Sequence, residues 1–145
     1  MIIREYRPED LEALTALMRD LGYPTDIDNM QNRLERIHST PMYYTFVAEE
    51  TASVVGMIGV RLVYYYEDDG LAAQIAALVT KREHQGKGIG RALVQYVEEW
   101  ALEKGAAVLF LTSGIREERM QAHEFYKGIG FEITGYRFVK KLKGS

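Results

Sequence analysis

The spacing of apolar residues divides the chain into a largely helical first part and a strand-rich middle. The opening run "MIIREYR" is typical of a short strand, and Pro8 follows it at a point where prolines commonly open helices. Apolar residues then recur at helical spacing to Leu21 and, after "LGYP", to about Ile37. Asp26 or Asp28 would cap the second of these helices. This part of the chain therefore predicts one strand followed by two helices.

Three strand patterns fill the middle of the chain. The runs "YYTFVAEE" and "VVGMIGVRLVYYY" are rich in β-branched and aromatic residues, and "LAAQIAALVT" is apolar enough to be a buried strand. The segments "ETAS" and "EDDG" between them have the composition of turns. Together these runs predict an antiparallel meander.

Helix and strand patterns alternate in the last third. An apolar stripe from Ile89 to Ala101 predicts a helix closed by Gly105, and "AAVLFLTS" predicts a buried strand joined by a right-handed parallel crossover. A further helix over "EERMQAHEFYKGIG" and two short strands over "FEITGYRFVKKL" complete the chain. The predicted order β α α β β β α β α β β describes one α/β (α+β) domain over residues 1–145, with a mixed, mostly antiparallel sheet.

Composition narrows the function. A chain of 145 residues suits one domain with a real core, and its net charge of −3 gives no sign of a nucleic acid or an anionic membrane as partner. The absence of cysteine excludes disulfides and thiolate chemistry, and no cluster of His, Asp and Glu has metal-ligand spacing. No apolar run approaches the ~20 residues of a membrane helix. We expect a cytoplasmic protein with no metal, membrane or nucleic-acid partner.

The stretch "KREHQGKGIGRALV" carries the strongest chemical signal. Three glycines stand at alternate positions directly before a helix, and their neighbourhood holds four bases and one acid, a local charge of +3. The N–H groups of a first helical turn, together with the helix dipole, form a site for phosphate, and glycine lets an anion approach the backbone. The stretch is thus either a phosphate or pyrophosphate cradle or a tight turn with a solvated basic rim.

Two nucleotide-binding motifs fit this stretch poorly. A Walker A loop needs lysine followed by Ser or Thr after its last glycine, and Gly90 is followed by Arg91. A dinucleotide fingerprint needs a third glycine that neither Arg91 nor Leu93 provides, and it normally lies in the first βα turn. Both nucleotide interpretations are therefore weak.

The loop and a second motif resemble the GCN5-related N-acetyltransferases. In that family the acyl-CoA signature is Gln or Arg, two residues, Gly, one residue, then Gly or Ala, and "QGKGIG" (85–90) matches it fully. The segment "AHEFYKGIGF" (122–131) resembles the family motif A-x-x-F-Y-x-x-x-G-F. The element order is also similar over essentially the whole chain, and the family fold has central strands that splay apart.

The resemblance implies a role for each matched position. Backbone groups of the strand before the glycines would pair with the pantetheine arm of acetyl-CoA, and the loop would bind its pyrophosphate. The implied CoA-binding residues are Leu78, Val79, Gln85, Gly86, Lys87, Gly88, Ile89, Gly90 and Arg91. Tyr126 would be the general acid that protonates the departing thiolate, a step suited to a phenol with a pKa near ~10. Its alternative role is that of a core aromatic on an amphipathic helix.

The acceptor is less defined than the donor. "RMQAHEFY" and "YRFVKKL" resemble the aminoalkylphosphonate N-acetyltransferase branch, which suggests a small amine bearing an acidic group. Arg119 stands where many members have Asn, and its guanidinium suits an acidic group, although a surface ion pair is an equal alternative. Tyr64 and Tyr66 would share one strand face and line an acceptor pocket, or serve cross-strand packing or a dimer surface.

No residue stands out as the base that deprotonates the amine. The branch tends to carry an acid in the strand before the loop, where this chain has Ala76 and Ala77. The remaining candidates are His123 and the acids of the turn before that strand, namely Glu67, Asp68 and Asp69. Each is equally compatible with a solvated surface position.

The sequence thus predicts an acetyl-CoA-dependent N-acetyltransferase acting on a primary amine of a small molecule. Two alternatives stay open: a peptide or protein amine as the acceptor, and a non-catalytic acyl-CoA-binding regulatory module. Family members are often dimers, and the C-terminal strand would be able to join the sheet edge of a second copy, so a homodimer is also expected by analogy.

Overall fold

The fold was analysed in a computed structural model that describes residues 1–113 and 120–143. The contacts divide the chain into two compact units, one ending at Leu111 and the other beginning at Thr112, and each is described by itself. Arg119, one of the predicted acceptor residues, lies outside the described residues.

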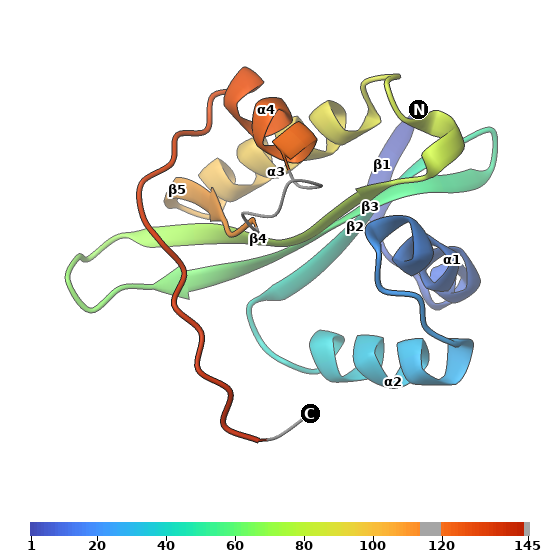
Figure 1. Cartoon of the computed structure of the whole chain (residues 1–145), viewed down its shortest axis with the longest axis horizontal. Coiled ribbons are helices and arrows are strands. Elements are labelled where there is room, and N and C mark those ends of the chain that lie inside the picture. Colours follow the sequence, from blue (N-terminus) through green and yellow to red (C-terminus); the bar gives the residue numbers. More distant parts are fainter. Residues whose placement is uncertain (114–119, 144–145) are drawn as a thin grey trace. The chain divides into compact units, whose positions relative to one another are not determined.

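The first unit contains a five-stranded mixed sheet in the order β1-β2-β3-β4-β5 (Figure 1). Strands β1 to β4 pair antiparallel, and β5 pairs parallel to β4, so the predicted meander and parallel crossover are confirmed. The strand bounds are β1 Ile2–Glu5, β2 Tyr43–Glu50, β3 Ser53–Tyr64, β4 Leu71–Thr80 and β5 Ala106–Leu111.

The described residues also form four helices. In the first unit these are α1 (Leu11–Leu21), α2 (Ile27–His38) and α3 (Ile89–Glu103), and the second unit contains α4 (Met120–Gly128). Their ends follow local chemistry. Gly22 closes α1 with a φ of 104°, and the Asp26 carboxylate accepts a 2.8 Å hydrogen bond from the N–H of Asn29 to cap α2. A short 3-10 turn, Pro8–Asp10, leads into α1 as the proline predicts.

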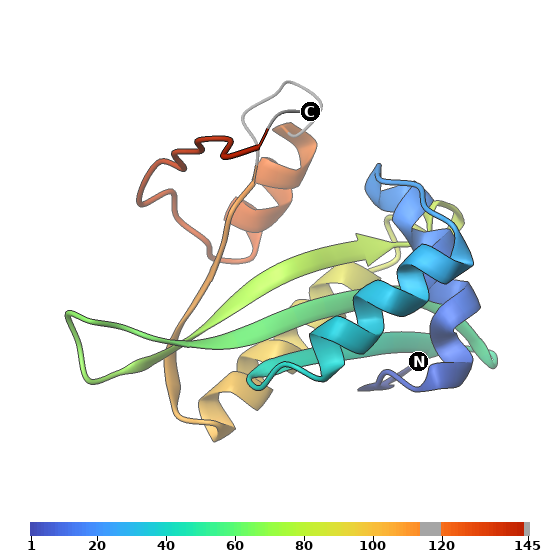
Figure 2. The same cartoon turned by 90° about the horizontal axis from the view of Figure 1, so that it is seen from below.

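Helices cover both faces of the sheet. In Figures 1 and 2, α1 and α2 lie on one face and α3 on the other. On the first face, Leu14 and Leu17 pack with Val47 and Met57 in a buried cluster. On the second, the rings of Tyr96 and Trp100 meet that of Phe46 edge-on at 5.1 and 5.4 Å. Successive strand residues alternate between these two helix-covered layers.

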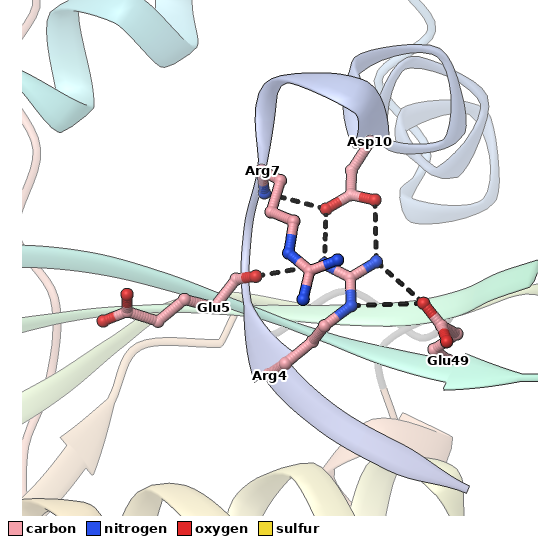
Figure 3. Close-up of polar contacts among 5 residues, drawn as sticks. All are labelled: Arg4, Glu5, Arg7, Asp10 and Glu49. Atoms are coloured by element: carbon pink, nitrogen blue, oxygen red, sulfur yellow. Dashed lines mark hydrogen bonds and ion pairs between the residues drawn. The ribbon is translucent and has the colours of Figure 1, made fainter. Parts of the chain in front are cut away.

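A partly buried ion-pair network ties the start of the chain to the sheet. Figure 3 shows Arg4 bonded to both oxygens of Asp10, at 2.8 and 2.9 Å, and to Glu49 at 2.9 and 3.1 Å. Asp10 is only 6% exposed and also accepts from the N–H of Arg7. The Arg4 hydrogen bonds hold the pKa of Asp10 below its usual value. The network therefore holds the residues that lead into α1 against β1 and β2.

The predicted fold class is confirmed, but two local predictions are wrong. Residues 131–143 form no strand in the described structure, although the run "FEITGYRFVKKL" predicts two short strands there. Their unit holds one helix and no strand among its described residues, and a strand needs a neighbour for its hydrogen bonds. Also, β3 ends at Tyr64, so Tyr66 belongs to the following turn rather than to the strand.

Candidate active site

The candidate site begins where β4 leaves the sheet. The N–H of Lys81 donates to the carbonyl of Val55 at 2.8 Å, which holds the first residue after β4 against β3. The chain then makes a short 3-10 turn, Arg82–His84, closed by a 2.8 Å bond from the N–H of His84 to the carbonyl of Lys81. The glycine segment therefore starts from a backbone anchored to the sheet.

Gly86 and Gly88 give the loop its shape. Their φ values are +81° and +84°, a left-handed conformation that side chains with a Cβ rarely adopt. No described atom lies within 4 Å of where a Cβ would stand on either residue. The loop thus presents bare backbone to open space, as an anion cradle requires.

Helix α3 starts directly on this loop, with Gly88 as its N-cap. The first hydrogen bond of the helix runs from the N–H of Ala92 to the carbonyl of Gly88, so the earlier N–H groups of the first turn have no partner within the helix. Ile89 is 3% exposed and anchors this end in the core, whereas Arg91 on the same turn is exposed. The unpaired N–H groups and the positive end of the helix dipole therefore point at the loop.

Gly56 allows α3 to lie this close to the sheet. A Cβ at this position would stand 3.1 Å from Cγ2 of Ile89, 3.1 Å from the carbonyl oxygen of Val79 and 3.2 Å from Cδ1 of Leu93. These distances are shorter than ordinary van der Waals contacts, so the glycine sets the approach of the first helical turn. The glycine inside "VVGMIG" is the signal that sequence reasoning left unused here.

The second part of the site is an open backbone edge on β4. β5 pairs with β4 only from Leu71 to Ile75, so within the described residues Ala76–Thr80 has no strand on that side. Leu78 and Val79 are held from the other side by β3. In the pairing of β3 with β4, Gly59 lies opposite Ala77 and Val60 lies opposite Ile75. Ala76 therefore has no partner on β3 and forms a β-bulge beside this edge. The predicted splay of the central strands agrees with this geometry.

The two parts are continuous and differ in what they attract. The loop is lined by the exposed basic residues Lys81, Arg82, Lys87 and Arg91, none of which forms an ion pair among the described residues. The β4 edge is uncharged and offers alternating N–H and C=O groups. A ligand with a phosphate-bearing end and an extended amide-bearing arm matches both parts, and acetyl-CoA is such a ligand.

The remaining predicted site residues in the described structure are tyrosines. Tyr126 lies on α4 in the second unit, where its ring contacts those of Phe125 and Phe131 edge-on at 5.4 and 5.8 Å. Tyr64 and Tyr66 are 73% and 108% exposed. Their assignment to the acceptor, like that of Tyr126 to proton transfer, stays a prediction.

The role of the predicted bases also stays a prediction. Glu67, Asp68 and Asp69 are exposed on the turn between β3 and β4, and Asp68 accepts a 3.0 Å bond from the N–H of Gly70. His123 lies on α4 in the second unit.

Comparison with known proteins identifies the class. The sequence model of the acetyltransferase (GNAT) family matches residues 9–131. The chain therefore belongs to this family, and it is an acyltransferase by membership. Within the described residues no helix is long and apolar enough to cross a membrane.

Individual relatives extend the comparison. The chain is 32% identical to the uncharacterized N-acetyltransferase YhdJ of Bacillus subtilis over 87% of each protein. It is 28% identical to the aminoalkylphosphonate N-acetyltransferase of Salmonella typhimurium, over 97% of this chain and 90% of that one. The crystal structure of a GNAT family acetyltransferase from Staphylococcus aureus superposes with a TM-score of 0.84 at 26% identity, covering 97% and 98% of the two chains.

Proposed function

We propose that the protein transfers the acetyl group of acetyl-CoA to a primary amine of a small molecule. The observation that carries this proposal is the continuity of the glycine loop with the open edge of β4. The glycine loop would bind an anion at the N-terminus of α3, and the open edge of β4 would pair with an extended amide chain. Membership of the acetyltransferase family supports acetyl-CoA as the ligand with both features.

The donor would lie along the site in one direction. The N–H groups from Gln85 to Arg91 would hold the pyrophosphate, with Lys87 and Arg91 adding positive charge. The pantetheine arm would run from there along Val79 and Leu78, which directs its thioester toward Ala77 and the bulge at Ala76. An N–H on this stretch of β4 would stabilise the oxyanion that forms during acyl transfer.

The proposed reaction is a direct attack. The neutral amine nitrogen adds to the thioester carbonyl, which forms the C–N bond and a tetrahedral oxyanion. Collapse of that intermediate breaks the C–S bond, and Tyr126 gives its phenolic proton to the departing thiolate. The nitrogen loses its extra proton to a base or to water, and the tyrosinate regains a proton from solvent.

The proposed acceptor class follows from one relative. The Salmonella relative, named for aminoalkylphosphonates, aligns over nearly the whole of both chains. We therefore propose a small amine rather than a peptide. The alternatives are a peptide or protein acceptor, which the donor site does not discriminate against, and an acyl-CoA-binding module without catalysis.

The test is release of free thiol from acetyl-CoA in the presence of aminoalkylphosphonates, polyamines, amino acids, aminoglycosides and short peptides. We expect turnover with a small-amine class, and a Tyr126→Phe variant that binds acetyl-CoA normally but turns over about 10²-fold or more slowly. Tyr136→Phe, an exposed tyrosine of the same unit, is the matched control and should retain activity. Tight acetyl-CoA binding without acetylation of any amine would refute the proposed enzyme activity.

A further inference from the structure

A polar row crosses the sheet face that α1 and α2 share. Tyr43, Arg61 and Gln74 stand opposite one another on β2, β3 and β4. Arg61 shares the strand face of Met57, which packs in the cluster under α1 and α2, because the two positions are an even number of residues apart. All three polar side chains are half-buried. This arrangement is unusual within otherwise apolar strands.

The row holds the Arg61 guanidinium in a defined place. Its Nε donates to Oε1 of Gln74, one of its terminal nitrogens donates to the Tyr43 hydroxyl at 3.4 Å, and its Cζ lies 6.0 Å from the centre of the Tyr43 ring. Both neighbours are neutral. They orient the guanidinium but do not neutralise its charge. Its remaining N–H groups stay available as hydrogen-bond donors.

No described carboxylate forms an ion pair with Arg61. The carboxylates of Asp10 and Glu49 pair with Arg4, and that of Glu50 lies 3.6 Å from His84. Exposed arginines are commonly unpaired because water solvates them, but a half-buried guanidinium has given up part of that solvation. An anion bound from solution would restore the lost interaction.

The row lies beside the path proposed for the acetyl group. Gln74 precedes Ala77 by three positions on β4, a distance of about 10 Å at the usual rise of a strand. On this face the next cross-strand pair beyond Arg61 and Gln74 is Gly59 with Ala77, and both of these residues are small. Helix α3 covers the opposite face, and Figure 2 shows the β3–β4 hairpin extending beyond α1 and α2. Apart from the chain neighbours of Gly59, only Ala77 lies within 4 Å of where a Cβ on Gly59 would stand, so no other described side chain blocks a small ligand there.

We propose that Arg61, positioned by Gln74 and Tyr43, binds the acidic group of the acceptor amine. The acceptor is then a short amine whose phosphonate or carboxylate lies a few bonds from its nitrogen. The acidic group contacts the guanidinium, and the nitrogen points along β4 toward the thioester. This inference rests on the proposed function and deepens it by assigning specificity to a residue of the first unit.

The expected loss of affinity follows from the hydrogen bonds between the guanidinium and the acidic group. A hydrogen bond to a charged group contributes enough binding energy to change affinity about 10- to 100-fold. Loss of Arg61 should therefore weaken binding of an acidic amine by that factor. It should leave a neutral amine of the same length unaffected, because that amine has nothing for the guanidinium to bind.

The test compares two probes, 2-aminoethylphosphonate and the neutral 3-aminopropan-1-ol, on wild type, Arg61→Gln, Arg61→Lys and Arg33→Gln. Arg33 is exposed on α2, so its variant makes the same change of net charge away from the row. Calorimetry with CoA at saturation measures binding without turnover, and thiol release from acetyl-CoA measures kcat/KM. A thermal melt with and without CoA confirms that each variant folds and binds CoA.

We expect Arg61→Gln to lose about 10- to 100-fold in affinity for the phosphonate and less than about twofold for the neutral amine, with Arg61→Lys between it and wild type. Equal losses for both probes, or no loss for either, would overturn the inference, as would wild type binding the phosphonate no better than the neutral amine. If the phosphonate bound but was not acetylated, the proposed acetyltransferase activity would be refuted, whereas the inferred binding role of Arg61 would be retained.

Discussion

The closeness of α3 to β3 makes Gly56 the position where one methyl group should disturb the donor site. In Gly56→Ala the new Cβ would stand 3.1 Å from the carbonyl oxygen of Val79, which is backbone and cannot rotate away. It would also stand 3.1 Å from Cγ2 of Ile89, the first residue of α3. Relief therefore requires the helix N-terminus to move outward by a few tenths of an ångström.

The expected magnitude combines two opposing terms. Overpacking of this kind costs about 1–3 kcal/mol, while replacing glycine inside a strand returns about 0.5–1 kcal/mol. The net loss in free energy of unfolding should be about 1 kcal/mol, or a melting temperature lower by about 3 °C for a chain of this size. Displaced N–H groups of the first turn should raise the Kd for acetyl-CoA about 3- to 10-fold.

Gly59→Ala supplies the matched control. Its Cβ would stand 3.9 Å from that of Ala77, an ordinary contact, on the same strand. We expect unchanged or slightly higher stability and an unchanged Kd for acetyl-CoA, measured by thermal melting and calorimetry. If Gly56→Ala were as stable as Gly59→Ala and bound acetyl-CoA equally well, the close approach would not set the donor site.

Two further predictions concern groups whose pKa is shifted. Asp10→Asn should lower the free energy of unfolding at pH 7 by about 1.5–3 kcal/mol, because it removes the charged acceptor of two Arg4 hydrogen bonds and leaves Glu49 as the remaining carboxylate on Arg4. The wild-type advantage should vanish in urea melts as pH falls through the depressed pKa of Asp10, below about 3.9. The His38 ring is hydrogen-bonded to the Thr45 hydroxyl at 3.0 Å, and burial is the main cause that lowers its pKa. Because the unfolded chain then binds the proton first, wild type should lose stability as pH falls below about 6.5. His38→Gln should flatten that slope on the acid side of about pH 6.5, and an unchanged slope would assign it to other groups.

Local patterns in the sequence predict much of this fold, and pairing between strands explains what they miss. The helix ends at Gly22 and Asp26 and the glycine loop before Ile89 depend on neighbouring residues, so periodicity and capping chemistry find them. Residues 131–142 include the aromatic and β-branched residues typical of strands, but such residues do not provide a partner strand. The prediction there failed for that reason.

For the site as well, the sequence predicts the parts made by adjacent residues and misses those made by contacts between strands. The loop was predicted because its glycines and bases are adjacent in sequence. Gly56 and the row of Arg61 with Gln74 act through contacts across strands, and only the observed register brings them together. Tyr126 is defined by its motif, and its place in the reaction stays a prediction.

The central claim, that the glycine loop holds the phosphates of acetyl-CoA, is tested most directly by a pair of matched variants. Gly88 and Gly105 stand at opposite ends of α3, with φ values of 84° and 93° and no described atom within 4 Å of where a Cβ would stand on either. The same backbone strain thus enters both Gly88→Glu and Gly105→Glu, and only the first places a carboxylate in the cradle. In calorimetric titrations we expect Gly88→Glu to weaken acetyl-CoA binding at least about tenfold, and Gly105→Glu to stay within about twofold of wild type. Equal affinity in the two variants, or no binding by wild type, would contradict the account.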